Sequence, residues 1–269
     1  MTTVLVTGGS MGIGLAVAQA LAAEGHRLVL VARGGDALEQ AAASLPGVGH
    51  RWHAFDVSDE AEWGRVELDE LHGLVCAAAV LAPVGAVGEY EPAEFRRTLE
   101  INVLGTLLAV HACLPALHAG AGSIVTFGGG GATAPLPRYD AYAASKAAVA
   151  RLSENLAVAL APLPVNCVAP GFVATRMHEA TLSAGPDAVG RAYYERTQRE
   201  LETGGFPAAE AAELVLLLLS GVPFTGKLIS AQWDPWRDPA FHQRLADQPD
   251  LATVRRIDGV LFDAVREAT

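Results

Sequence analysis

Glycines crowd the junction between the first predicted strand, residues 3–7, and an Ala-rich helical segment, residues 12–24. The junction reads Thr7-Gly8-Gly9-Ser10-Met11-Gly12-Ile13-Gly14. Glycine lets the backbone turn tightly and approach a phosphate group without an intervening Cβ atom. A helix that begins there offers free N–H groups and the positive end of its dipole to that anion. The pattern therefore favours a dinucleotide-binding turn over a glycine-rich turn without a ligand.

The rest of the chain alternates short apolar runs with longer segments of helical spacing. Six more strands are predicted, over residues 28–32, 51–55, 74–78, 123–127, 165–168 and 227–230. Helices are predicted over residues 36–44, 59–68, 92–118, 141–160 and 208–219, with Asp36 and either Ser58 or Asp59 as N-caps. Strands that are apolar throughout are typical of a sheet covered by helices on both faces. This order predicts a single α/β domain with a Rossmann-type, doubly wound parallel β-sheet.

Residues 1–232 are expected to form the dinucleotide-binding and catalytic domain. Within it, residues 175–205 are long and mixed in character, and they are predicted to form a helical lid over the substrate. Residues 233–269 follow the last strand and are expected to pack on the body or on another subunit. Trp233 and Trp236 in this extension would either wall a pocket or join subunits, and joining subunits is favoured.

The acidic balance of the chain narrows its partners. With 19 Lys and Arg against 30 Asp and Glu, the formal charge is −11, which opposes binding to nucleic acid or to an anionic membrane. The longest late apolar run, residues 214–219, is too short to span a bilayer, and the N-terminus is predicted to be a strand, not a signal peptide. We therefore expect a cytoplasmic protein. Cys76, Cys113 and Cys167 are predicted to be reduced thiols, and no metal-ligand spacing appears.

Tyr142 and Lys146 lie four residues apart in one predicted helix, so their side chains share a face. A nearby ammonium group favours the phenolate, which would lower the pKa of Tyr142 from its usual value of about 10. Such a tyrosine can exchange a proton with a carbonyl or hydroxyl oxygen. Alone, the pair is more often a solvated helix face. Together with the glycine turn, it indicates an acid–base catalyst.

These motifs resemble those of the short-chain dehydrogenase/reductase family over residues 3–229. The resemblance implies that Asp56 and Val57 contact adenine and that Asn102 holds a water molecule of a proton relay. It also implies that Tyr142 and Lys146 are the catalytic pair and that Thr175 holds the carboxamide. The positions so implied for the cofactor are Gly8, Ser10, Met11, Gly12, Ile13, Gly14, Arg33, Asp56, Val57, Ala78, Tyr142, Lys146, Pro170, Gly171, Val173 and Thr175.

The family's activity is hydride transfer between NAD(P) and a small-molecule ketone or secondary alcohol, usually in a homotetramer or homodimer. An acidic residue often ends the second strand of NAD-binding folds and holds the ribose 2′-hydroxyl. Here Ala32 ends that strand and Arg33 follows it, and the nearest acidic residue is Asp36, in the following helix. Because a guanidinium group suits a 2′-phosphate, NADP(H) is favoured and NAD(H) is the alternative.

Two segments depart from the family pattern. Cys76-Ala77-Ala78-Ala79 stands where the family has Asn-Asn-Ala-Gly, and Gly129 stands where a serine normally donates a hydrogen bond to the substrate oxygen. Losing such a donor costs about 10²–10³ in rate in other enzymes. Thr133, a backbone N–H of the glycine run, or no donor at all are the open alternatives.

Gly129 and His178 are the predicted substrate contacts, with Tyr193 and Tyr194 as further candidates in the lid. His53, His111 and His118 are expected to be packing or surface residues. The favoured hypothesis is an NADP(H)-dependent reductase of ketones or dehydrogenase of secondary alcohols. The alternatives are a redox-neutral enzyme catalysing elimination, epimerisation or cyclisation, and a catalytically silent nucleotide-binding subunit.

Overall fold

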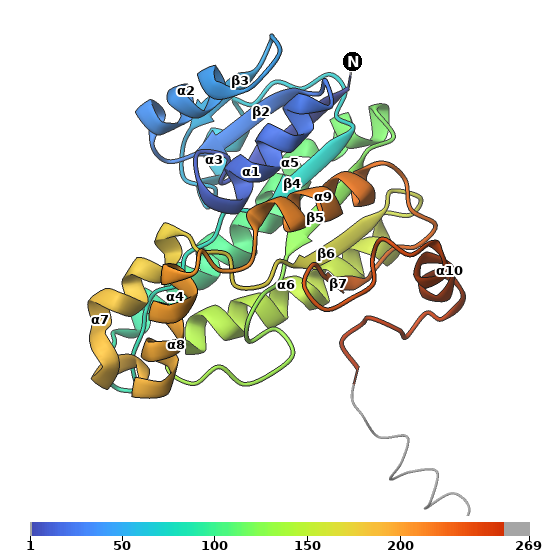
Figure 1. Cartoon of the computed structure of the whole chain (residues 1–269). Coiled ribbons are helices and arrows are strands. Elements are labelled where there is room, and N and C mark those ends of the chain that lie inside the picture. Colours follow the sequence, from blue (N-terminus) through green and yellow to red (C-terminus); the bar gives the residue numbers. More distant parts are fainter. Residues whose placement is uncertain (1, 256–269) are drawn as a thin grey trace, which may run out of the picture.

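A seven-stranded parallel sheet forms the centre of the computed structural model, which describes residues 2–255 (Figure 1). The strand order is β3-β2-β1-β4-β5-β6-β7, so the predicted doubly wound Rossmann-type sheet in a single domain is confirmed. The strands are β1 (Thr3–Thr7), β2 (Arg27–Ala32), β3 (Arg51–Ala54), β4 (Gly73–Cys76), β5 (Ser123–Phe127), β6 (Val165–Ala169) and β7 (Leu228–Ser230). Because the chain order reverses beside β1, between β1 and β4, a crevice for a ligand is expected at the carboxyl ends of these strands.

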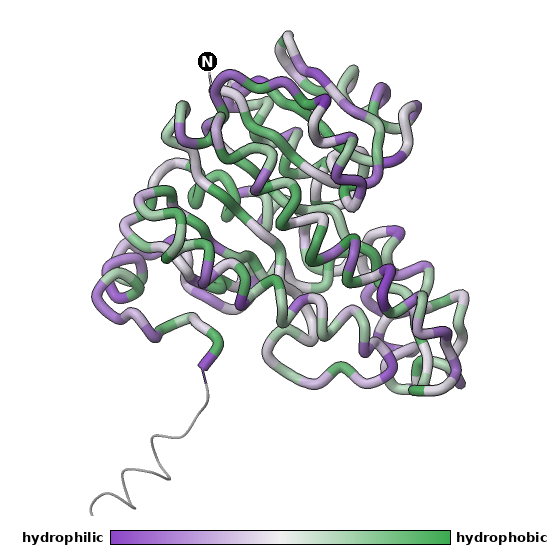
Figure 2. Tube along the Cα trace, turned by 180° about the vertical axis from the view of Figure 1, so that it is seen from behind, coloured by the Kyte–Doolittle hydropathy of each residue, from purple (hydrophilic) through white to green (hydrophobic). Residues whose placement is uncertain are grey.

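Helices cover both faces of the sheet. On one face lie α1 (Gly12–Ala23), α2 (Gly35–Ser44) and α9 (Ala208–Leu219), and on the other lie α5 (Gly105–Ala119) and α6 (Asp140–Ala159). Alternate residues of β1 enter the two cores, with Val4 and Val6 facing α1 and Leu5 facing α5. The tube in Figure 2 is accordingly green along the interior and more purple toward the outside.

The predicted length of the third helix and one predicted N-cap were wrong. The helix predicted over residues 59–68 is a single turn, α3 (Glu60–Trp63). It ends at Gly64, because glycine is a poor helix former. The buried indole of Trp63 donates to the carbonyl of Val57 at 2.9 Å, which ties this turn to the chain before it. Asp59 is its N-cap, accepting from the Ala61 N–H. Asp36 is not an N-cap, because α2 begins one residue earlier with Gly34 as its cap.

The helix predicted over residues 92–118 is continuous but changes pitch. α4 (Pro92–Leu99) leads into a π-helical turn, η1 (Glu100–Leu104), and then into α5. In the described part of the chain, residues 92–119 are the one helix with the length and hydropathy to cross a membrane, and half of its apolar window is buried in the protein. That degree of burial is typical of the core helix of a folded domain. A π turn often marks a functional site, and Asn102 lies within this one.

Residues 175–205 form a helical unit at one end of the molecule. It consists of a short 3₁₀ turn, η2 (Arg176–His178), then α7 (Glu179–Val189) and α8 (Arg191–Glu202), which pack on each other (Figure 1). A β-bridge between Val173 and Gly205 closes its base. We call this unit the lid.

The chain after β7 packs on the body as far as it is described. It contains α10 (Pro239–Asp247), and the buried Trp236 donates from its indole to the carbonyl of Ala231 at 3.0 Å. Lys227 is buried and its Nζ donates to the carbonyls of Gln248, Pro249 and Leu251 at 2.8–2.9 Å. Trp233, in contrast, is 79% exposed. Residues 256–269 of the predicted extension lie outside the described residues.

Candidate active site

In the glycine turn after β1, the backbone is packed so closely around Gly8 and Gly14 that neither position can accept a side chain. A Cβ atom on Gly14 would lie 2.2 Å from the carbonyl oxygen of Gly8. Gly8, at φ +69°, would place a Cβ 2.9 Å from the backbone of Ala78, just beyond β4. Both glycines are therefore required by close backbone approach.

The start of α1 is open to an anion. Its N-cap, Met11, makes no side-chain hydrogen bond to the first turn in the described structure, so the first N–H groups of a twelve-residue helix remain available. A Cβ on Gly12 would lie 3.2 Å from Cγ2 of Thr175. The structure thus brings the glycine turn and the predicted carboxamide-binding threonine together. A dinucleotide fits this cradle, with its pyrophosphate at α1.

Lys146 is held beneath Tyr142 on α6. Its Nζ lies 5.6 Å from the centroid of the Tyr142 ring and donates to the carbonyl of Phe127 at 2.9 Å. The side chain is buried, and this burial lowers the pKa of Lys146 to about 8. The ammonium group therefore faces the end of β5 and the phenol ring, as the predicted catalytic pair requires.

The expected lowering of the Tyr142 pKa is not found. Burial raises the pKa of this phenol, and the nearby phenol of Tyr193 raises it further. The reason is that the Lys146 ammonium group contacts a carbonyl oxygen and lies over the ring, while desolvation disfavours the phenolate. Tyr142 is consequently a neutral phenol at neutral pH in this structure.

Gly129 faces the Tyr142 hydroxyl. A Cβ atom on Gly129 would lie 3.0 Å from that oxygen, and its φ is +148°. The loop position that the family pattern gives to a serine is thus beside the proposed reacting group, without a hydroxyl. Thr133, the alternative donor, is exposed farther along the same loop, and the structure records no contact between it and Tyr142.

The side chain of Asn102 forms hydrogen bonds to the chain after β4 and to α6. Its Nδ2 donates to Ser145 Oγ and to the Val80 carbonyl, both at 2.9 Å, and its Oδ1 accepts from the Val80 N–H at 2.8 Å. Ser145 in turn donates to the Tyr142 carbonyl at 2.7 Å. Asn102 therefore joins the π turn, the chain after β4 and the catalytic helix. Sequence reasoning missed Ser145, although it lies beside Lys146 in the same motif.

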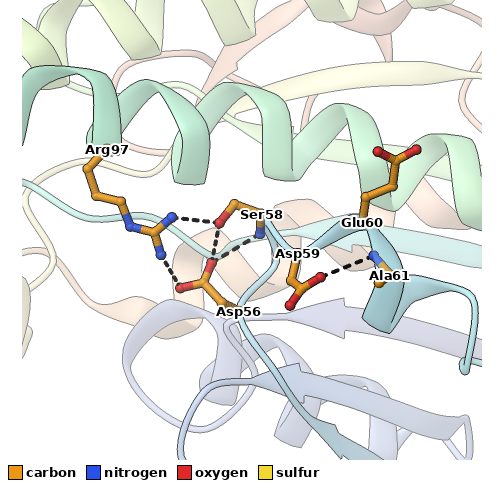
Figure 3. Close-up of a pocket in the computed structure, with 6 residues that line it drawn as sticks. All are labelled: Asp56, Ser58, Asp59, Glu60, Ala61 and Arg97. Atoms are coloured by element: carbon orange, nitrogen blue, oxygen red, sulfur yellow. Dashed lines mark hydrogen bonds and ion pairs between the residues drawn. The ribbon is translucent and has the colours of Figure 1, made fainter. Parts of the chain in front are cut away.

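The predicted adenine contacts lie where β3 ends. Asp56 accepts from the N–H and the hydroxyl of Ser58 at 3.0 and 2.7 Å, and it pairs with Arg97 of α4 at 2.5 Å (Figure 3). Burial alone would raise the pKa of Asp56, but the Ser58 hydrogen bonds and the charges of Arg97 and Arg33 lower it overall. Val57 is buried. Arg97 had no signal in the sequence pattern.

A polar pocket of about 650 Å³ opens beside this carboxylate (Figure 3). It is lined by Asp56, Ser58, Asp59, Glu60, Ala61 and Arg97. Arg33 is exposed just beyond β2, and its charge is near enough to act on Asp56. The predicted 2′-phosphate and adenine residues are therefore neighbours in space.

The remaining predicted residues follow β6. Pro170, Gly171 and Val173 lead from the strand to Thr175, and Gly171 has a φ of +81° with Phe206 and Gln232 around it. His178 stacks on Phe172, with ring centroids 4.0 Å apart and an interplanar angle of 16°. Burial lowers the pKa of His178, and its Nδ1 is buried without a partner among residues 2–255.

Nothing in the described residues is arranged as a metal site. Groups of three or more His, Cys, Asp or Glu side chains suited to a metal do not occur within residues 2–255. Cys76, Cys113 and Cys167 are free and buried.

Known proteins of one family resemble this chain over most of the residues that form the site. The family model described as short chain dehydrogenase matches residues 2–184. Cis-4-hydroxycyclohexanecarboxylate dehydrogenase of Sinomonas cyclohexanicum is 33% identical over 79% of this chain and 91% of its own length. Cyclopentanol dehydrogenase of Comamonas testosteroni is 36% identical over 70% of this chain and 83% of its own. Human dehydrogenase/reductase SDR family member 4 is 34% identical, over 64% of this chain and 66% of its own length.

Solved structures with bound nicotinamide cofactors share the fold. The structure of NAD⁺-bound xylitol dehydrogenase has a TM-score of 0.76 and 28% identity, covering 85% of this chain and 96% of that one. An actinorhodin polyketide ketoreductase with NADPH has a TM-score of 0.73 and 26% identity, covering 85% and 95%. Both forms of the nicotinamide cofactor are therefore found among the structural relatives.

Proposed function

Because this chain belongs to the short chain dehydrogenase family, and is as such a nicotinamide-dependent oxidoreductase of an alcohol–carbonyl pair, we propose that it interconverts a ketone and a secondary alcohol with NADP(H). One observation carries the proposal. Tyr142 and Lys146 share one face of α6, and Lys146 is anchored to the end of β5 at the edge of the sheet where the glycine turn begins α1.

The residues of the cradle have separate tasks. The N–H groups at the start of α1 bind the pyrophosphate, Thr175 beside Gly12 holds the carboxamide end, and Lys146 donates to the adjoining ribose. When bound, the cofactor supplies or accepts the hydride. Gly8 packs so closely on the backbone of Ala78 that a side chain at position 8 would displace that backbone.

Tyr142 is proposed as the proton donor. Because burial raises its pKa, the phenol is protonated at neutral pH and can give its proton from Oη to a carbonyl oxygen as the carbon is reduced. In the oxidative direction the phenol must first ionise.

Arg33 favours NADP(H) over NAD(H). Its exposed guanidinium group follows β2, where an NAD-binding fold commonly has a carboxylate for the ribose 2′-hydroxyl. A guanidinium group binds a phosphate with paired, charge-assisted hydrogen bonds. Asp36, in the first turn of α2, is the acidic residue nearest to Arg33 in the sequence.

A cyclic, largely apolar ketone is the proposed substrate class. The lid and the first turn of α6 form an apolar cluster around Leu81, Tyr139 and Val189, against which Tyr142, Met177 and Tyr193 pack. Two of the relatives are named as dehydrogenases of cyclic alcohols, and one of these alcohols, cyclopentanol, carries no charge, while the other carries a carboxylate. A ring without charge suits such surroundings.

We further propose that the protein works in the cytoplasm as a homodimer or homotetramer. Leu104 and Leu107 on the helix of residues 92–119 are 42% and 41% exposed, and Val158 on α6 is 82% exposed. Large apolar side chains exposed on neighbouring helices favour association. Sedimentation of the purified protein would give its mass.

The test is to titrate the purified protein with NADPH and with NADH, and then to add cyclopentanone. We expect tighter binding of NADPH and loss of its absorbance upon addition of the ketone. Failure to bind either nucleotide would contradict the proposal. A substrate consumed with no change in the bound nucleotide would instead support a redox-neutral reaction at Gly129 and Tyr142.

A further inference from the structure

The site lacks one hydrogen-bond donor that ketone reduction needs, if the proposed function holds. Charge develops on the substrate oxygen during hydride addition, and a donor aimed at that oxygen is worth about 10²–10³ in rate in other enzymes. Gly129 has no side chain, and its φ of +148° together with the 3.0 Å approach to Tyr142 leaves little room for one. A side-chain donor to this oxygen would therefore have to come from another element.

The five tyrosines differ in whether their hydroxyl groups are already bonded. Tyr90 donates to Asp140 at 3.0 Å, and Tyr139 shares a 2.8 Å hydrogen bond with Thr181. The hydroxyls of Tyr142, Tyr193 and Tyr194 have no hydrogen-bond partner among residues 2–255 and are not sealed from solvent. These three can therefore bond to a ligand without breaking an internal contact.

Tyr193 lies over the first turn of the catalytic helix. Its ring is 5.0 Å from that of Tyr139, centroid to centroid, and Tyr139 is the N-cap of α6, three residues before Tyr142. Both Tyr142 and Tyr193 pack on the apolar cluster of Leu81, Tyr139 and Val189. Tyr142 and Tyr193 are therefore neighbours across the gap between α6 and α8.

The lid is tied to the loop before α6, so this arrangement does not depend on the apolar contacts alone. Arg138 donates from Nη1 to the carbonyls of Asp187 and Ala188, at 3.0 and 2.7 Å. The hydrogen bond between the hydroxyl groups of Tyr139 and Thr181 of α7 adds a second buried link. Tyr193 is thereby held in place beside the catalytic helix.

The electrostatic surroundings keep the Tyr193 hydroxyl protonated. Burial raises the pKa of Tyr193, and the charge of Arg196 only partly offsets this. A neutral phenol donates one hydrogen bond, and a donor in an apolar site interacts strongly with developing charge because little water competes.

We propose that Tyr193 of the lid donates the hydrogen bond to the substrate oxygen that a serine at position 129 would otherwise donate. In ketone reduction the hydride adds to the carbonyl carbon, the carbonyl π electrons move to the oxygen, and the proton passes from Tyr142 Oη to that oxygen. Tyr193 keeps its own proton throughout. The lid thus supplies a catalytic residue as well as apolar contacts to the substrate.

The experiment compares Tyr193→Phe with Tyr90→Phe, which removes a hydroxyl group that already donates to Asp140. With cyclopentanone and NADPH, Tyr193→Phe should lower kcat by about 10²-fold, while the Kd for NADPH and the thermal unfolding midpoint stay at the wild-type values. Tyr90→Phe should keep kcat within about threefold of wild type. The phenylalanine retains the ring that packs on Tyr139, so a purely structural role would leave kcat unchanged.

Two results would overturn the inference in distinguishable ways. If the wild-type protein reduces cyclopentanone and Tyr193→Phe does so at the same rate, Tyr193 is not the donor and the proposed function stands. If the wild-type protein reduces neither cyclopentanone nor other cyclic ketones although NADPH is bound, the proposed function fails and the role of Tyr193 fails with it.

Discussion

A Cβ atom on Gly129 would lie 3.0 Å from the hydroxyl oxygen of Tyr142. That contact is tighter than most van der Waals contacts of a methyl group, and the φ of +148° at Gly129 is a conformation that residues with a Cβ seldom adopt. The departure from the family pattern at this position is therefore a change in loop backbone and not only the loss of a hydroxyl. A serine side chain cannot be restored here without moving the loop or Tyr142.

Gly129→Ser is expected to impair the enzyme. The new side chain would strain the backbone by about 1–3 kcal/mol and press on the Tyr142 hydroxyl, so we expect a lower unfolding midpoint and at least a tenfold fall in kcat, roughly the effect of a misplaced catalytic group. Steady-state kinetics and thermal unfolding measure both.

Gly130→Ser is the matched control for this loop. A Cβ there would meet only Leu136 Cδ2, at 3.8 Å, and no left-handed φ is required. Near wild-type stability and rate are expected. If Gly129→Ser instead raised the rate, the site would be a serine site with its donor removed, and the role assigned to Tyr193 would be contradicted.

Arg33→Ala should weaken NADPH selectively. Hydrogen bonds to a charged group contribute about 1.5–3 kcal/mol, so the Kd for NADPH should rise by roughly tenfold to a hundredfold while that for NADH stays constant. Arg27→Ala, at the opposite end of β2, is the control and should affect neither. An equal effect of Arg33→Ala on both nucleotides would rule out a 2′-phosphate contact.

Lys146 should make stability depend on pH. Its pKa is lowered by burial from 10.5 to about 8, so between these values the unfolded chain binds more protons than the folded chain, and stability rises with pH. Below pH 8 both states are protonated and the burial penalty, about 3 kcal/mol at most, is fully present.

Urea unfolding of wild type and Lys146→Met at two pH values isolates this effect, because other titrating groups cancel in the difference. At pH 7 the methionine variant should be the more stable protein, and by pH 10 its advantage should shrink. An advantage that is equal at both pH values would show that Lys146 is not buried in its charged form.

Asn102→Ala should uncouple the catalytic helix from the chain after β4. The change leaves the Val80 N–H and carbonyl without their partner and removes a donor to Ser145, so a loss of about 2–4 kcal/mol is expected in urea unfolding. Ser145→Ala, which removes the bonds made by one hydroxyl group, should cost about 1 kcal/mol. Equal losses would argue against the bracing role of Asn102.

Much of the fold followed from the sequence because strand and helix signals are local. Short apolar runs between helical segments predicted all seven strands to within two residues at either end. The glycine spacing predicted the turn before α1. The third helix was predicted too long because its helical spacing runs past Gly64, where a packed tryptophan and a glycine end it.

The site was predictable only where its residues share one segment. Tyr142 and Lys146 lie on one helix, so their spacing indicated a common face. The pKa of Tyr142 depends on burial by the lid and on the carbonyl that holds Lys146, and neither is visible in the spacing. Arg97 and Tyr193 reach their partners across long chain separations, which no local pattern reports.

The reduction of cyclopentanone by NADPH, followed by the loss of reduced-nicotinamide absorbance in wild type and in Tyr142→Phe, tests the central claim most directly. The account predicts turnover by wild type and a fall of at least about 10²-fold in Tyr142→Phe, with the Kd for NADPH unchanged. Undiminished turnover in Tyr142→Phe would contradict it.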